Sequence, residues 1–170
     1  MLACVDVQYQ DDNAAAACLT FSDWTSSASL QEFTAEISGV EPYVSGEFYR
    51  RELPCLLEVL ARLPELPEVV VIDGYVWLGD HKPGLGAYLF EALAGRVPIV
   101  GVAKTSHLQA SPSVEIFRGE SRTPLLISAV GIGLEEAASL VSSMNGSFRI
   151  PTLLKKVDQL ARAALRGSTR

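Results

Sequence analysis

The chain has few cysteines and lacks any long apolar run. Cys4, Cys18 and Cys55 are odd in number and lack metal-like spacing, which indicates reduced thiols rather than a disulfide framework or a zinc site. No apolar run reaches the length of a membrane span, and Asp6 comes too early for a secretory signal. We therefore expect a cytoplasmic protein that does not associate with membranes.

Basic residues are also in short supply. The chain holds 14 Lys and Arg against 20 Asp and Glu, a formal net charge of −6. This balance argues against broad nucleic-acid binding, because contact with phosphates favours a basic surface. It does not exclude a nuclease with a metal site made of carboxylates, since the bound cations reverse the local sign of charge.

Repeats, low-complexity tracts and linkers are absent as well, so residues 1–170 are expected to form a single domain. Periodicity predicts a weaker strand at residues 30–37 and firmer ones at residues 2–8, 14–21, 69–73, 98–103 and 124–128. Helices are predicted at residues 53–60 (with Pro54 in the first turn), 84–93, 134–141 and 151–165, and exposed loops at 79–83 and 105–113. This order indicates an α/β fold with a mixed sheet flanked by helices, and no glycine-rich turn follows the first strand as in a Rossmann fold.

Asp73 is the most informative residue of the sequence. It ends the β-branched run of residues 69–72 and precedes Gly74. Ligands of open α/β sheets bind at the carboxyl ends of strands, so a carboxylate at this position is a candidate ligand-binding group. The structural alternative is a turn residue, since Asp-Gly is a favourable turn pair.

Three further carboxylates can likewise be interpreted either as ligand-binding groups or as structural residues. Asp6 lies inside the first strand, where a charge is costly unless it is paired or binds a metal. Glu52 is near a predicted helix start, where a solvated carboxylate would also be stable, and Asp158 is on the last helix, where it would otherwise be exposed. Together with Asp73 they suggest a Mg²⁺ site of the phosphodiester-cleaving type. Lys104 follows a buried strand and is either a phosphate-binding cation or an ordinary surface lysine.

Five stretches in order resemble the endonuclease V family. They are Cys4-Val5-Asp6-Val7, Pro42-Tyr43-Val44-Ser45-Gly46 running on through Arg51-Glu52-Leu53-Pro54, Val70-Val71-Ile72-Asp73-Gly74, Pro98-Ile99-Val100-Gly101-Val102-Ala103-Lys104, and Arg149-Ile150-Pro151 leading to Asp158. The resemblance covers nearly the whole chain. It implies a ribonuclease H-like fold, dependence on Mg²⁺ or Mn²⁺, and cleavage of DNA or RNA at the second phosphodiester bond 3′ of deoxyinosine or inosine.

The resemblance also assigns roles to residues. It implies that Asp6, Glu52 and Asp73 bind metal with a contribution from Asp158, and that Lys104 contacts the scissile phosphate or positions the attacking water. Tyr43, in a loop ending at Gly46, would be a wedge between bases, although a tyrosine that merely anchors the loop is the alternative.

The sequence departs from the family in the loops. Ser45 replaces a proline of the wedge, and residues 75–82 replace a His-Pro-Arg stretch that helps to receive the extruded base. His81 would substitute for that histidine if the loop shifts register, and Gly84 completes the expected substrate-binding residues.

Three functions therefore compete. The leading hypothesis is a metal-dependent endonuclease, monomeric, whose partner is nucleic acid containing a deaminated base. The second keeps the nuclease chemistry with another nucleic-acid substrate. The third is a ribonuclease H-like module that binds nucleic acid or protein without cutting, which the acidic pI near 4.9 favours and the clustered carboxylates oppose.

Overall fold

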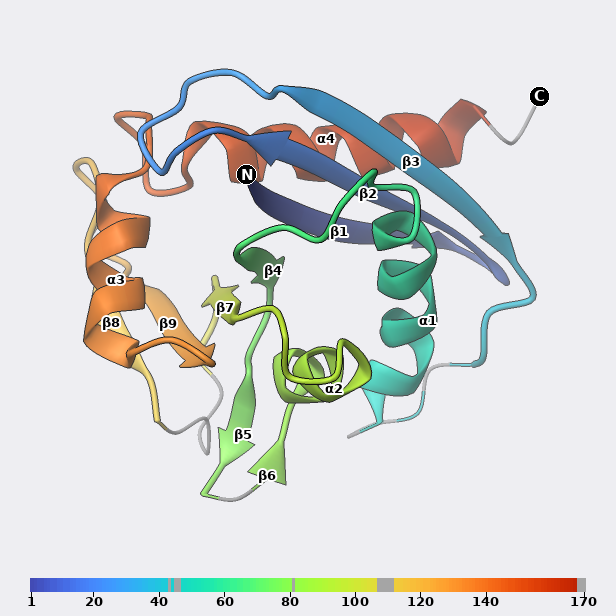
Figure 1. The fold of residues 1–170 in the computed structure, drawn as a ribbon, viewed down its shortest axis with the longest axis horizontal. Helices are drawn as coiled ribbons and strands as arrows, with labels where there is room; N and C mark the ends of the chain where they lie inside the picture. Colours follow the sequence, from blue (N-terminus) through green and yellow to red (C-terminus); the bar gives the residue numbers. More distant parts are fainter. Residues whose placement is uncertain (43, 45–46, 81, 107–111, 168–170) are drawn as a thin grey trace.

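A computed structural model describes residues 1–42, 44, 47–80, 82–106 and 112–167 (Figure 1). Its strands are β1 (Leu2–Gln10), β2 (Asn13–Phe21), β3 (Gln31–Ser38), β4 (Val70–Asp73), β5 (Trp77–Gly79), β6 (Lys82–Pro83), β7 (Ile99–Ala103), β8 (Val114–Ile116) and β9 (Leu125–Val130). Its helices are α1 (Phe48–Leu60), α2 (Leu85–Ala92), α3 (Leu134–Ser143) and α4 (Thr152–Gly167). None of these helices is both long and apolar enough to cross a membrane.

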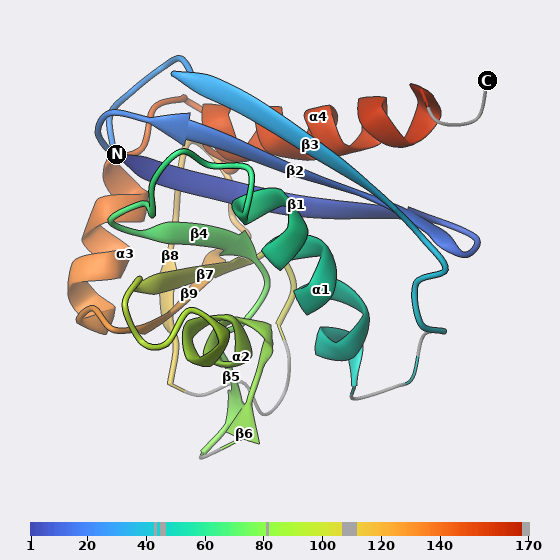
Figure 2. The same ribbon diagram turned by 45° about the vertical axis from the view of Figure 1, so that its right-hand side comes forward.

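Seven strands form one mixed sheet in the order β3-β2-β1-β4-β7-β9-β8. The three central strands β1, β4 and β7 run parallel, and the strands on either side pair antiparallel. The sheet is strongly twisted, as Figures 1 and 2 show from two directions. The prediction of an antiparallel start followed by strand–helix–strand units is confirmed. Because the central strands are parallel, their carboxyl ends lie at one edge.

Each face of the sheet is covered by its own pair of helices. Side chains alternate along a strand, so Cys4 faces one side and Val5 the other. Cys4, with Val71 and Val102, packs in the core formed with α3 and α4. Val5, with Ile72, packs in a second core with α1 and α2 on the opposite face. The edge where β1, β4 and β7 end is therefore reached by helices from both faces.

Two local predictions are wrong. Residues 79–83, expected to be an exposed loop, include β6 and the end of β5, which form a small separate hairpin. Helix α1 begins at Phe48, so Pro54 lies inside the helix beyond its first turn. The earlier start is explained by aromatic packing, since Phe48 meets the ring of Tyr9 edge-to-face at 6.2 Å. Strand β8 was not predicted, because three residues are too few to show a period.

Candidate active site

The register of the central strands brings Asp6 and Asp73 together. Val5 pairs with Ile72 across the parallel strands β1 and β4, and the next residue on each strand is an aspartate. Residues that are level on neighbouring strands point to the same face of a sheet. Asp6 and Asp73 therefore lie side by side on the α4 face at the carboxyl edge, where the sequence predicted a ligand site.

Lys104 reaches the same place from β7. Asp73 pairs with Val102, and Lys104 lies two residues further on, so its side chain projects from the same face. The Nζ atom of Lys104 is 2.5 Å from Oδ2 of Asp73. Both side chains are less than 40 % exposed, at 39 % and 37 %. Lys104 is thus an ion-paired residue of the site and not an ordinary surface lysine.

Glu52 approaches this edge from α1 on the other face. It lies beyond the first turn of the helix and is only 5 % exposed. Burial raises the pKa of its carboxyl well above the usual value, and the charges of Asp6 and Asp73 raise it further. The Oε2 atom is buried, and it has no hydrogen-bond partner among the residues that the structure describes. The alternative of a solvated helix N-terminus is therefore wrong for Glu52, whose carboxyl belongs to the acidic cluster.

The carboxyl of Asp6 also has a raised pKa in this cluster. Burial raises the pKa of its carboxyl from 3.8 to about 6, and the hydrogen bond from Gln8 opposes this rise. Asp73 and Asp158 each add to the shift through their negative charge. The carboxylates thus destabilise one another's charged forms, as expected where a cation is bound by several acidic side chains.

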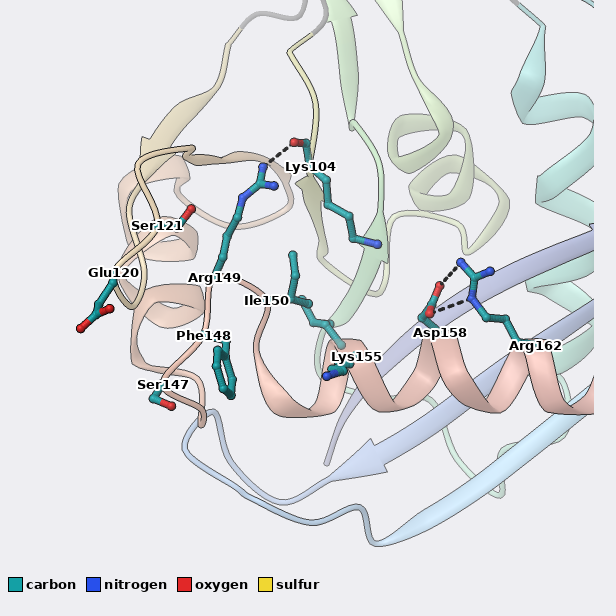
Figure 3. Close-up of a pocket in the computed structure, with 11 residues that line it drawn as sticks. Lys104, Glu120, Ser121, Ser147, Phe148, Arg149, Ile150, Lys155, Asp158 and Arg162 are labelled. Carbon is teal, nitrogen blue, oxygen red and sulfur yellow. Dashed lines mark hydrogen bonds and ion pairs between the residues drawn. The ribbon is translucent and has the colours of Figure 1, made fainter.

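Asp158 joins the cluster from α4 through hydrogen bonds. Gln8 donates to both aspartates, with Nε2 at 3.0 Å from Oδ2 of Asp6 and 3.1 Å from Oδ1 of Asp158. Arg162, one helical turn further on, donates to both carboxylate oxygens of Asp158 at 2.9 and 3.0 Å and holds its pKa below the usual value (Figure 3). Asp158 is thus paired and partly buried, not the freely exposed residue of the structural alternative.

The donor set fits a hard divalent cation. Mg²⁺ takes oxygen ligands and is commonly held by one or two carboxylates with water and substrate phosphate. Asp6, Glu52 and Asp73 supply only oxygens, and Oε2 of Glu52, which has no hydrogen-bond partner in the described part of the chain, is available as a ligand atom. Within the part of the chain that the structure describes, no three Asp, Glu, His or Cys side chains already surround a common point as ligands. The contacts explain this, since Asp73 is turned to Lys104 and Asp158 to Arg162.

The expected substrate-binding residues are only partly visible. Tyr43, Gly46 and His81 lie outside the described residues. Gly84 precedes α2 and donates its N–H to the Val76 carbonyl at 2.8 Å. A Cβ at this position would lie 2.7 Å from the Tyr75 carbonyl oxygen, so packing alone already requires glycine. Contact with substrate by Gly84 stays a prediction.

Two positioning residues were missed by sequence reasoning. Gln8 has a signal in hindsight, because it lies two residues from Asp6 on β1 and must share its face. Arg149 lies in one of the five family-like stretches, but nothing in the sequence around it indicates its contacts. Its Nη2 donates to the Lys104 carbonyl and, at 2.8 Å, to the Pro124 carbonyl, and both partners are distant in sequence. It thereby fastens the residue after β7 to the segment before α4.

Comparison with known proteins agrees with this geometry. The sequence model of the Endonuclease V family matches residues 1–141. Endonuclease V of Streptomyces coelicolor is 33% identical over an alignment 186 positions long, which covers 96% of this chain and 78% of the relative.

Solved structures show the same fold. The crystal structure of endonuclease V from Streptomyces avermitilis superposes with a TM-score of 0.81 at 27% identity, covering 99% of this chain and 82% of the other. Endonuclease V of Ciona intestinalis, crystallised with a 24mer DNA containing an inosine followed by a ribo-adenosine, has a TM-score of 0.80 at 19% identity and covers 98% and 86%. The expected ribonuclease H-like fold is confirmed. The chain belongs to the endonuclease V family of nucleases.

Proposed function

We propose that this chain hydrolyses the second phosphodiester bond 3′ of a deoxyinosine or inosine in DNA or RNA. The observation that carries the proposal is the side-by-side placement of Asp6 and Asp73, close enough to the buried carboxyl of Glu52 for their charges to raise its pKa. These three residues would hold Mg²⁺ or Mn²⁺. When bound, such an ion supplies an acidified water and stabilises charge on the reacting oxygens.

The chain's own residues prepare the rest of the site. Lys104 places a positive charge at the edge where the scissile phosphate would lie, and such a charge stabilises the negative charge that develops in the transition state. Gln8 fixes the rotamers of Asp6 and Asp158 by donating to both. Arg162 keeps Asp158 ionised by lowering its pKa. Asp158 therefore adds negative charge beside the cluster and contributes to cation binding.

A second substrate class is favoured by the segment after Asp73. The Tyr75 hydroxyl donates to the Thr105 carbonyl at 2.8 Å, and the Val76 N–H donates to Ser128 Oγ at 2.9 Å. These contacts fix Tyr75 and Val76, the first residues of the segment that differs from the family's usual His-Pro-Arg stretch. A nuclease with the same catalytic centre and a different lesion or structured substrate is the alternative that this observation supports.

One assay separates the two. Labelled DNA and RNA strands, each with and without a single deoxyinosine or inosine, are incubated with the purified protein in Mg²⁺ and in Mn²⁺. Cleavage one nucleotide 3′ of the modified base, absent from the unmodified strand, is the expected result. Equal cutting of modified and unmodified strands would contradict specificity for inosine and support a nuclease with a different nucleic-acid substrate. Binding without cutting on every strand would contradict nuclease activity altogether.

We further propose a monomeric, single-domain protein of the cytoplasm. The strands of the seven-stranded sheet come from residues 2–130, and the C-terminal helix α4 packs in the same core as β1, which supports one domain. Cys4, Cys18 and Cys55 are all buried and free, as suits a reducing compartment. Light scattering on a sizing column tests the monomer, and a mass near twice the chain's 18.3 kDa would contradict it.

A further inference from the structure

A basin of about 900 Å³ lies beside the acidic cluster, between α4, the segment that precedes α4 and the connection from β8 to β9 (Figure 3). Its walls include Lys104, Phe148, Arg149, Lys155, Asp158 and Arg162. The residues assigned above to cation binding and phosphate contact use only its inner end. Most of its volume therefore has no role in the function proposed so far.

The basin is continuous with the active site. A small neighbouring cavity is lined by Asp6 and Asp73, and the two hollows share Lys104, Ile150, Leu154 and Asp158 as lining residues. Lys104 thus stands at the boundary, with its ammonium toward Asp73. A polymer whose phosphate lies at Lys104 has a path from that phosphate into the basin.

The charge of the basin opposes that of the whole protein. Four cationic side chains line it against two carboxylates, although the chain carries a net charge of −6. Arg162 is neutralised by Asp158, and Arg149 binds backbone carbonyls. Lys155 is exposed, and within the described residues its ammonium has no recorded ion pair or hydrogen bond. Against the exposed carboxylate of Glu120, Arg149 and Lys155 therefore leave an excess of positive charge that would attract a polyanion.

Phe148 presents an apolar ring at the outer wall. It is 75 % exposed, although a side chain of this type is normally buried. Its backbone is held in place, because the buried guanidinium of Arg118 donates to the carbonyls of Phe148 at 3.0 Å and Gly146 at 3.1 Å. Gly119, with φ +59°, packs so closely against Ser147 that a Cβ would lie 2.3 Å from its carbonyl oxygen. An exposed aromatic ring on a fixed backbone suits base stacking.

From these observations we infer that the basin binds the single nucleic-acid strand adjoining the scissile bond, with a base stacked on Phe148 and a phosphate paired with Lys155. The inference rests on the proposed nuclease function, since continuity with Lys104 sets which strand enters. Positive charge combined with an aromatic platform is the usual chemistry of sequence-tolerant single-strand binding. The site would therefore raise affinity for the flanking nucleotides without reading their sequence.

Cleavage kinetics on truncated substrates test the inference. Inosine-containing strands are prepared with long flanks on both sides, or with only the 5′ or only the 3′ flank. Phe148→Ala and Lys155→Gln are compared with wild type and with matched controls: Phe117→Ala removes an aromatic ring that is 61 % exposed outside the basin, and Arg96→Gln removes an exposed charge beyond α2.

The basin variants should raise KM about tenfold on strands that keep the flank entering the basin, because one stacked base or one phosphate contact is lost. Their kcat should be unchanged, their KM on the strand lacking that flank should match wild type, and Phe148→Tyr should restore the affinity. Lys155→Gln should also weaken the salt dependence of binding, lowering its slope by about 1.

Three results separate the inference from the function on which it rests. If Phe148→Ala behaves like Phe117→Ala on every strand while wild type still cuts at inosine, the basin is not a strand-binding site and the function stands. If wild type cuts no strand, the proposed function fails. Fluorescence anisotropy with a labelled unmodified single strand then still tests whether the basin binds nucleic acid. Equal affinity of wild type and Phe148→Ala would contradict strand binding in the basin.

Discussion

The ammonium of Lys104 and the carboxylate of Asp73 form an ion pair at 2.5 Å between the ends of two neighbouring parallel strands. The guanidinium of Arg149 donates a hydrogen bond to the backbone carbonyl of Lys104 and so fixes the position of this residue. The pair gives each residue a partner within the chain at the edge where a substrate phosphate and a divalent cation would lie. On the proposed function, Lys104 turns to the phosphate and Asp73 to the cation.

Lys104→Gln should lower cleavage of the inosine strand by about 10²-fold or more in kcat, because a charge aimed at the transition state is lost from a partly buried site. The fold should persist, since both partners are more than one-third exposed and the pair adds little stability. Single-turnover cleavage gives the rate, and circular dichroism checks the fold. Lys156→Gln is the control, because it removes an exposed lysine of α4 that forms an ion pair with Glu32 on β3. Equal activity of the two variants would remove Lys104 from the catalytic residues.

Asp6→Asn should stabilise the protein in EDTA at pH 7 while abolishing cleavage. The folded pKa of Asp6, about 6, lies above its unfolded value. The folded state therefore binds the proton more tightly, and wild type loses stability as the pH rises from about 4 through 6. The Asn variant has no such loss, so its free energy of unfolding should rise relative to that of wild type by about 2–3 kcal/mol over this pH range. Urea unfolding of both proteins at pH 4 and pH 7 measures the difference in their free energies of unfolding. A difference that does not change with pH would show that the pKa of Asp6 is not raised in the folded state.

Mg²⁺ should raise the melting temperature of wild type, because a ligand that binds only the folded state stabilises it. At about 100 times the dissociation constant the gain is about 2.7 kcal/mol, or roughly 5–10 °C for a chain of this size. Glu52→Gln should lose most of this gain. Glu58→Gln, an exposed position on the same helix, should keep it. Melting curves with and without Mg²⁺ give the comparison, and a gain retained in Glu52→Gln would exclude that carboxyl as a ligand.

Arg118→Met should destabilise the fold by about 2–4 kcal/mol, because several backbone carbonyls lose a charged donor. Arg118 is 7% exposed and donates to the carbonyls of Met144, Gly146 and Phe148. The exposed Arg122 provides the matched control, since Arg122→Met removes the same charge from the surface. Urea unfolding of both variants is the measurement. A similar small change in both would show that the guanidinium does not organise this segment.

Strand periodicity gave the order of the main elements well, because the buried strands near residues 70 and 100 are short apolar runs with clear ends. The carboxylate cluster could also be anticipated, since Asp6 and Asp73 lie where two parallel strands end. Strands β5, β6 and β8 could not, because two or three residues carry no periodic signal.

The contacts that orient the site were beyond local sequence reasoning. Gln8 and Arg149 act through partners 150 and 45 residues away in the chain. Only the folded sheet brings those groups within hydrogen-bonding distance. The start of α1 was misplaced for a similar reason, since Phe48 is held by the ring of Tyr9 on a distant strand.

Parallel cleavage assays of a single-inosine strand in Mg²⁺ with wild type and Asp73→Asn decide whether Asp73 binds the catalytic metal. We expect one cut by wild type, one nucleotide 3′ of inosine, and a loss of cleavage rate of at least about 10³-fold in the variant with unchanged circular dichroism. A fully active Asp73→Asn protein would contradict the assignment of this carboxylate at the carboxyl edge of the sheet as a metal ligand.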